Sequence, residues 1–242
     1  LQFTPDLVPA DIVGTRIYKA STESFEIELG AVFANIVLAD EINRAPAKVQ
    51  SALLEVMAER QVSIGGTTFP VPAPFMVMAT QNPIESEGVY PLPEAQRDRF
   101  LMKVLVDYPS GREEVEVVRR MSVSPPEAAQ VIAQEDLGEL QAAADRVFIH
   151  DAIVDYAVRL VLATREPAGH GLPDLVGLIS HGASPRATLG LVRAARALAL
   201  LRGREFVLPQ DVYDIAPDVL RHRVLLSYEA LADGVTAESI VN

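Results

Sequence analysis

Short apolar runs separated by polar turns fill the first part of the chain, and this pattern predicts strands. Residues 25–29 alternate between apolar side chains and glutamate, the period of two that is typical of a strand with one buried face. Together with residues 15–18, which precede a polar turn, they predict a β-hairpin. A second hairpin is expected over residues 61–69, because two glycines stand at its centre.

Three further apolar runs predict buried strands, and the first of them is apolar on both faces, which is typical of a parallel strand. They cover residues 36–39, 75–79 and 100–106. Between the first two, Pro46 is followed by apolar side chains at spacings of three and four. This pattern predicts an amphipathic helix that starts at the proline and ends near Arg60.

Beyond Pro109 the apolar positions recur with the period of a helix. Amphipathic helices are expected over residues 112–121, 134–147, 151–165, 186–202 and 209–226, the last one broken at Pro217. Strand–helix alternation followed by an all-helical block predicts an α/β fold. We expect a parallel sheet with flanking helices and two β-hairpin inserts in residues 1–108, and a helical domain in residues 109–242.

Composition and charge exclude several classes of protein. The chain has 21 basic and 33 acidic side chains and a formal net charge of −12, which disfavours nucleic-acid binding. It has no cysteine, which excludes disulfides and thiolate catalysis and fits a cytoplasmic location. No segment offers the roughly 18 uncharged apolar residues of a membrane span, so we expect no membrane insertion.

Two adjacent carboxylates, Asp40 and Glu41, directly follow the apolar run 36–39. The carboxyl end of a buried strand is where open α/β sheets bind ligands. Phosphoryl transfer needs a carboxylate for Mg²⁺ and a group that positions the attacking water. Asp40 suits the first role and Glu41 the second, although a solvated strand end explains the same pair.

Three other side chains are candidates for the same chemistry. Asn82 follows the run 75–79, where an amide can orient water or contact a γ-phosphate; a turn residue is the alternative. Arg99 could reach the phosphate of a neighbouring subunit as an arginine finger; a surface salt bridge is the alternative. Arg186 stands near a helix start, where the helix dipole disfavours a cation and suggests an anionic partner; plain capping by Ser184 is the alternative.

Four segments together carry a family resemblance. They read FANIVLADEIN over residues 33–43, ATQNPIE over 79–85, YPLPEAQRDRF over 90–100 and GASPRA over 182–187. In this order they closely resemble the MoxR family of AAA+ ATPases, and the resemblance runs from Phe3 to about residue 228. It implies part of an AAA+ core in residues 1–108 and a helical lid in residues 109–242.

The resemblance also implies a role for each candidate residue. Asp40 and Glu41 match Walker B, and Asn82 matches sensor 1. Arg99 matches the arginine finger, and Arg186 matches sensor 2. Arg97 is the alternative finger. The implied cofactors are ATP and Mg²⁺, with Asp40 reaching the metal through water. The first hairpin matches the helix-2 insert of the family and the second its pre-sensor-1 hairpin, and such inserts line the pore of a ring.

A P-loop, the phosphate-binding Gly-x-x-x-x-Gly-Lys-Ser/Thr motif, is missing from the sequence. None of the three lysines follows a glycine. We therefore expect the P-loop upstream, in a longer protein of which these residues are a portion. We expect this portion alone to bind ATP poorly and to be inactive, and the strand before Asp40 to lack a neighbour on one flank.

The function that the resemblance implies is that of a chaperone-like ATPase, which couples ATP hydrolysis to protein remodelling or to metal-cofactor maturation. The implied partners are further copies in a ring, a hexamer, and a client such as a protein with a von Willebrand factor A domain. A magnesium-chelatase-type motor subunit and a non-hydrolysing interaction scaffold are the alternatives.

Overall fold

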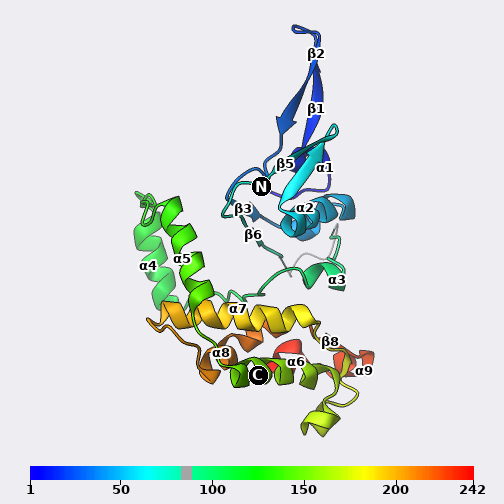
Figure 1. Cartoon of the computed structure of the whole chain (residues 1–242), viewed down its shortest axis with the longest axis vertical. Coiled ribbons are helices and arrows are strands. Elements are labelled where there is room, and N and C mark those ends of the chain that lie inside the picture. The colour runs from blue at the N-terminus through cyan, green and yellow to red at the C-terminus, as the bar shows by residue number, and fades with distance from the viewer. Residues whose placement is uncertain (83–88) are drawn as a thin grey trace. The chain divides into compact units, whose positions relative to one another are not determined.

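The computed structural model describes residues 1–82 and 89–242, which form two compact units, Leu1–Phe100 and Leu101–Asn242 (Figure 1). The boundary between the units lies at residues 100 and 101, before residue 108, where the change of apolar pattern along the chain placed it. The reason is that the segment after Phe100 packs on the second unit. The Lys103 amide donates to the Asp218 carbonyl at 2.8 Å, and the Leu101 carbonyl accepts from Arg223 at 3.0 Å.

The first unit combines two antiparallel hairpins, a two-stranded parallel sheet and one long helix. Its elements are α1 Pro9–Val13, β1 Gly14–Lys19, β2 Ser24–Leu29, β3 Ile36–Ala39, a 3₁₀ turn Ile42–Arg44, α2 Ala47–Glu59, β4 Gln61–Ile64, β5 Thr67–Pro70, β6 Met76–Ala79 and α3 Glu94–Arg97. β1 pairs with β2 and β4 with β5, so both predicted hairpins are confirmed. β3 and β6 form the predicted parallel pair.

The core of the first unit lies between the parallel sheet and α2. The helix begins after Pro46 and ends at Glu59, close to the prediction, and Arg60 caps its end in a left-handed conformation with φ 57°. On β3, Val37 and Ala39 are buried, whereas Ile36 is 55% exposed. The core side chains include Phe3, Ile12, Val37, Ala39, Val49, Leu53, Leu54 and Val56.

One predicted strand is wrong. Residues 100–106 form no strand in the structure. A strand needs a neighbour for its backbone groups, and the Lys103 amide instead bonds to a carbonyl near the end of a helix. Val104 and Val106 are 64% and 90% exposed. The run is apolar enough for a strand, but no second strand pairs with it among the described residues.

The expected open flank beside Asp40 is also wrong at the end of β3. The Asp40 amide donates to the Leu1 carbonyl, and the Asp40 carbonyl accepts from the Phe3 amide, both at 2.8 Å. The Ala39 carbonyl accepts instead from Thr80, just after β6. Because successive residues of a strand bond to opposite edges, the first residues of the chain lie along the edge of β3 that faces away from β6.

The second unit is helical. Its elements are α4 Gly111–Met121, α5 Gln134–Arg146, α6 Asp151–Arg165, two 3₁₀ turns Ala168–His170 and Pro173–Leu175, β7 Ile179–His181, α7 Pro185–Leu201, α8 Pro209–Leu220, β8 Leu225–Leu226, α9 Tyr228–Ala232 and α10 Ala237–Val241. α7 lies along α6 and α8, and their apolar faces form the core (Figure 1). Among the described helices, none has both the length and the apolar character to cross a bilayer.

Pro217 does not break α8, which contradicts the prediction. The helix continues through Pro217 and ends at Leu220, before the expected end at residue 226. Proline lacks the N–H that would bond to the carbonyl four residues earlier. That residue is Tyr213, which lies on an exposed face of the helix with 58% of its surface accessible.

Candidate functional site

The candidate site lies at the carboxyl ends of β3 and β6. The two strands are in register, with Ala39 beside Ala79. Asp40 and Thr80, which directly follow the two strands, are therefore neighbours. The Thr80 hydroxyl donates a 2.6 Å hydrogen bond to Oδ1 of Asp40. The parallel pairing thus gives Asp40 a polar partner that lies 40 residues away in the sequence.

Glu41 turns the chain sharply out of the strand. Its backbone is left-handed, with φ 54° and ψ 49°, a conformation that costs a residue with a side chain about 1–2 kcal/mol. The Glu41 amide donates to the Thr80 hydroxyl at 2.9 Å, and the Ile42 amide donates to the Thr80 carbonyl at 3.0 Å. These two hydrogen bonds oppose relaxation of the turn.

Two donors hold the Glu41 carboxylate. Oε2 accepts from the Gln2 side-chain amide at 2.8 Å and from Nη1 of Arg44 at 3.0 Å. Gln2 belongs to the segment beside β3, and Arg44 ends the 3₁₀ turn that follows Glu41. The carboxylate is therefore fixed in direction while its side chain keeps 20% of its surface exposed.

A buried glutamine supports this turn from the side of α2. Gln50 is fully buried, and its side-chain amide faces the carbonyl oxygens of Ile42, Ala45 and Tyr90 at 2.8–3.2 Å. An amide carries only two hydrogens, so one of them is shared. Gln50 thus links the turn after Glu41 to the segment that leads to α3.

Asn82 lies three residues beyond the end of β6 and is half-buried. It is the last described residue before the gap, and residues 83–85 of the ATQNPIE segment lie outside the described residues. Asn82 therefore lies in the segment that directly follows β6, as Thr80 does.

The two arginines near α3 differ in their surroundings. Arg99 is exposed, and its Nη1 donates to the Leu54 carbonyl of α2 at 2.9 Å. Arg97 ends α3 and is half-buried, and its Nε is buried without a hydrogen-bond partner among the described residues. Arg99 is therefore the more accessible of the two predicted finger candidates.

Arg186 belongs to the second unit, in the first turn of α7. Its amide donates to the Ser184 side chain at 3.1 Å, which confirms the predicted helix cap. The loop before the cap packs tightly on α6. A Cβ at Gly182 would come within 2.4 Å of the Thr164 carbonyl, and the Thr164 hydroxyl accepts from the Ala183 amide at 2.9 Å. This packing fixes the start of α7 and with it the exposed Arg186.

Three supporting residues were missed by the sequence analysis, and two of them left a signal. Thr80 directly follows the apolar run that pairs with β3, so parallel pairing in register places it beside Asp40. Gln50 is a polar residue on the apolar face of a predicted helix, between Val49 and Leu53. Gln2 has no comparable signal, since nothing local predicts that the first residues lie along β3.

The donor set fits a magnesium ion that arrives with phosphates. Mg²⁺ prefers oxygen ligands and is usually held by one or two carboxylates together with substrate phosphates. Asp40 and Glu41 supply carboxylates at one sheet edge. Elsewhere in residues 1–82 and 89–242, no group of three or more His, Cys, Asp or Glu side chains could enclose a metal. These carboxylates suit a metal shared with a nucleotide better than a metal enclosed by protein.

Comparison with known proteins matches both parts of the chain to one family of ATPases. Residues 1–102 match the ATPase family associated with various cellular activities (AAA), and residues 177–242 match the AAA lid domain. Chaperone MoxR1 of Mycobacterium tuberculosis is 63% identical over the whole of this chain. The uncharacterized protein YeaC of Bacillus subtilis is 46% identical, again over the whole chain and over 73% of its own length. This chain belongs to the MoxR family of AAA+ ATPases.

A solved structure of another protein has the same fold. The crystal structure of a candidate ATPase from Cytophaga hutchinsonii is 47% identical and aligns with a TM-score of 0.93 over 100% of this chain and 74% of its own. More distantly, the magnesium-chelatase subunit ChlI of tobacco is 28% identical over 78% of the chain and 42% of its own length. The chain spans 64% of the length of MoxR1.

Proposed function

We propose that this chain is part of a chaperone-like AAA+ ATPase of the MoxR type, which hydrolyses ATP to remodel partner proteins or to assist metal-cofactor maturation. The observation that carries the proposal is the cluster of Asp40, Glu41 and Thr80 at the ends of two parallel strands. It combines a metal-binding carboxylate with a second, oriented carboxylate, which is what phosphoryl transfer to water requires. The P-loop is supplied by a segment outside these residues.

The two carboxylates have different roles in the proposed reaction. Asp40 would hold Mg²⁺, and the ion, when bound, would neutralise the charge of the phosphates. Glu41 acts as the base that orients the attacking water and takes its proton. Gln2 and Arg44 occupy Oε2 of Glu41, so Oε1 is the oxygen that faces the water.

Three other side chains complete the site in a ring. Asn82 acts as sensor 1 and helps to place the water. Arg99 reaches the phosphate of the neighbouring subunit, with Arg97 as the alternative, and Arg186 acts as sensor 2 from the lid. Arg99 and Arg186 are both exposed, which supports contacts with a nucleotide. We expect the ring to be a hexamer.

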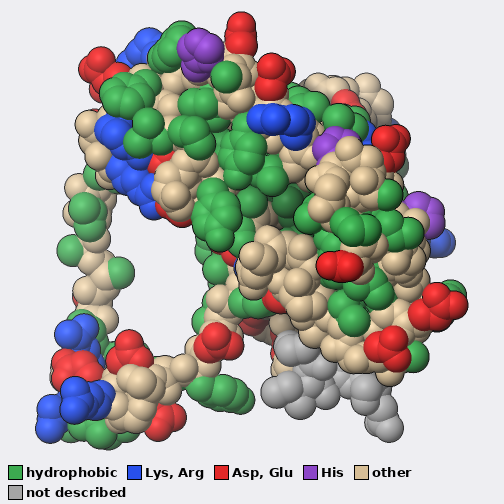
Figure 2. Space-filling view, turned by 90° about the horizontal axis from the view of Figure 1, so that it is seen from below, with side chains coloured by type: hydrophobic (Ala, Val, Ile, Leu, Met, Phe, Trp, Pro, Cys, Tyr) green, Lys and Arg blue, Asp and Glu red, His purple; other side chains and the backbone are tan. Residues whose placement is uncertain are grey.

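Client proteins, rather than nucleic acids, are the proposed partners. On the face seen in Figure 2, basic and acidic side chains are interspersed, which does not favour a polyanion. The net charge of −12 points the same way. A protein with a von Willebrand factor A domain is the expected kind of client, and the cytoplasm is the expected location.

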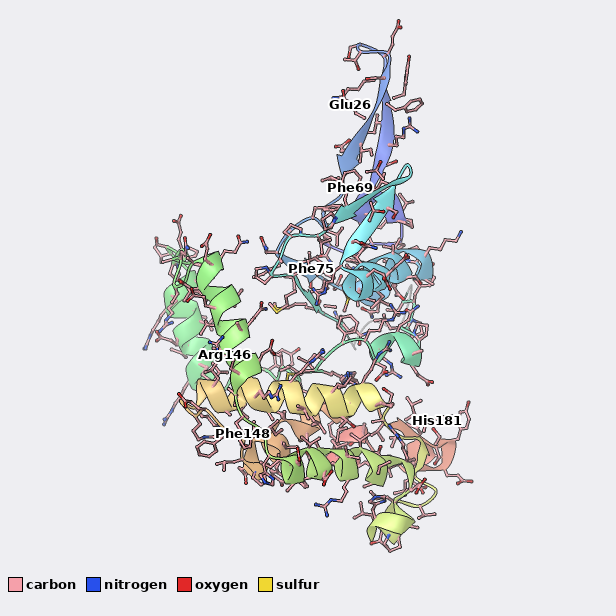
Figure 3. The ribbon with its side chains drawn as sticks, in the orientation of Figure 1. Glu26, Phe69, Phe75, Arg146, Phe148 and His181 are labelled. Atoms are coloured by element: carbon pink, nitrogen blue, oxygen red, sulfur yellow. The ribbon has the colours of Figure 1, made fainter. Side chains whose placement is uncertain are left out.

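The hairpin β1–β2 offers a contact surface for such a client. Near its end Tyr18 and Phe25 are 53% and 57% exposed, and their rings meet edge to face at 5.2 Å. The Arg16 guanidinium lies 4.2 Å from the centre of the Phe25 ring. Glu26, labelled in Figure 3, pairs with Lys19 at 2.5 Å. An exposed aromatic pair with a cation is suited to transient contacts with polypeptide side chains.

The substitution Glu41→Gln in the full-length protein tests this function. We expect ATP binding to persist, because the amide keeps the shape of the side chain, and steady-state hydrolysis to fall about 10²–10⁴-fold, because the base is lost. Glu55→Gln is the matched control, since Glu55 is exposed on α2 and should tolerate the same chemical change. Near-normal hydrolysis by Glu41→Gln would contradict the Walker B assignment. A wild-type protein that binds ATP without hydrolysing it would instead favour the scaffold.

A further inference from the structure

Thr80 makes four hydrogen bonds to the end of β3 and to the turn that follows it. Its amide donates to the Ala39 carbonyl and its carbonyl accepts from the Ile42 amide, both at 3.0 Å. Its hydroxyl donates to Oδ1 of Asp40 at 2.6 Å and accepts from the Glu41 amide at 2.9 Å. Every hydrogen-bonding group of Thr80 is therefore used on four consecutive residues.

We infer that Thr80 is a positioning residue for the proposed ATPase reaction, which orients Asp40 and holds the turn at Glu41 through its hydroxyl. This inference rests on the function proposed above. A hydroxyl is suited to this place because it can donate and accept at the same time. An amide or a carboxylate of similar size lacks a single atom that does both.

The hydroxyl fixes which oxygen of Asp40 is available. Oδ1 accepts the hydrogen of Thr80, so rotation of the carboxylate would break a short hydrogen bond. Oδ2 is the oxygen that would be available to a bound magnesium ion. Outer partners that orient a metal-binding group in this way commonly change metal affinity or activity about 10–100-fold when they are removed.

The same hydroxyl supports the left-handed backbone of Glu41. Such a conformation persists for a residue with a side chain only when its surroundings hold it in place. The Glu41 amide has the Thr80 hydroxyl as its acceptor. Without that acceptor the turn at Glu41 loses one of its two anchors, and the carboxylate moves away from Gln2 and Arg44.

Two substitutions separate the hydroxyl from the rest of the side chain. Thr80→Val keeps the shape and removes the hydroxyl, whereas Thr80→Ser keeps the hydroxyl and removes the methyl group. Thr80 is exposed, so neither change leaves a buried cavity, and both variants should fold.

Amide hydrogen exchange in the full-length protein without nucleotide measures directly how well the Glu41 amide is protected by its hydrogen bond to Thr80. In Thr80→Val the Glu41 amide should exchange about tenfold faster than in the wild type, because its acceptor is gone. In Thr80→Ser its rate should stay close to that of the wild type. The Ile42 amide is an internal control, since its acceptor is the backbone carbonyl of residue 80, which both variants retain.

Steady-state kinetics then tests the consequence for the reaction. Thr80→Val should lower kcat about 10–100-fold with little change in the KM for ATP, and Thr80→Ser should restore kcat. Unchanged exchange at Glu41 in Thr80→Val would overturn the inference, as would equal loss of kcat in both variants. If the wild type hydrolyses no ATP, the proposed function fails, while the exchange rates still decide whether Thr80 holds the turn.

Discussion

Arg99 is tied to Leu54 by a hydrogen bond of 2.9 Å from its Nη1 to the Leu54 carbonyl oxygen. Leu54 lies on the buried face of α2, whereas Arg99 is exposed. One nitrogen of the guanidinium is thus anchored on its own unit, while the side chain stays exposed. This arrangement suits an arginine that acts on a phosphate bound by another subunit.

Arg99→Ala should therefore lower ATP hydrolysis by the full-length ring, by about 10³-fold if Arg99 is the finger. When this variant is mixed with Glu41→Gln, some hydrolysis should return. The reason is that certain interfaces of a mixed ring pair an intact Glu41 with an intact Arg99. The measurement is steady-state hydrolysis as a function of the mixing ratio.

Arg97→Ala is the control for this experiment and should have the milder effect, because Arg97 is half-buried at the end of α3. An equal or larger loss in Arg97→Ala would assign the finger to Arg97. Absence of recovery in rings that are shown to be mixed would count against action between subunits.

Gln50→Leu should destabilise the protein, because it removes a fully buried donor that faces the carbonyl oxygens of Ile42, Ala45 and Tyr90. Loss of hydrogen bonds to buried groups should lower the free energy of unfolding by about 1–3 kcal/mol. Denaturant unfolding measures this change. Gln61→Leu is the matched control, since Gln61 is exposed at the start of β4, and an equal shift in the two variants would show that Gln50 has no special role.

Asp211→Asn should destabilise the second unit at neutral pH. Asp211 is fully buried, and its carboxylate accepts from Arg204 at 2.5 and 2.8 Å, from Arg202 at 2.8 Å and from the Leu208 amide at 2.7 Å. The hydrogen bond from Arg204 is the main cause that lowers the pKa of Asp211, and the bonds from Leu208 and Arg202 act in the same direction. We expect a loss of about 2 kcal/mol in the free energy of unfolding.

The pH dependence of this loss has a definite sign. Because the pKa of Asp211 is lower in the folded than in the unfolded chain, its contribution is complete above the unfolded value of about 3.9 and is lost as the pH falls through the folded value. The difference in stability between the wild type and Asp211→Asn should thus shrink below about pH 4. Asp155→Asn, at an exposed position of α6, is the control, and a difference that stays constant down to pH 2 would refute this account.

The 242 residues alone should bind Mg-ATP poorly. Most phosphate contacts in a P-loop protein come from backbone amides of the loop and from its lysine, and this motif is not in the sequence. Individual arginine contacts of about 1.5–3 kcal/mol each do not offset an association cost of about 4 kcal/mol or more. Isothermal titration calorimetry should show no binding below millimolar concentration, and a micromolar dissociation constant would place the nucleotide site elsewhere.

The local sequence was sufficient where neighbours along the chain decide the structure. The turn of the second hairpin needs two residues with positive φ, and Gly65 and Gly66 adopt 58° and 86°. α2 follows from its apolar spacing after Pro46, and the cap at Ser184 follows from residue type. The adjacency of Asp40 and Glu41 at a strand end could likewise be predicted, because it depends only on where an apolar run stops.

The tertiary structure decided every contact that joins distant segments. Residues 100–106 have the composition of a strand, but a strand exists only where a second backbone meets its hydrogen-bonding groups. Thr80 reaches Asp40 because the register of β3 and β6 sets them side by side. Gln50 likewise meets Tyr90 because the chain returns past α2. Such pairings depend on which segments pack together, and this is decided by burial and backbone pairing over the whole unit rather than by the residues on either side.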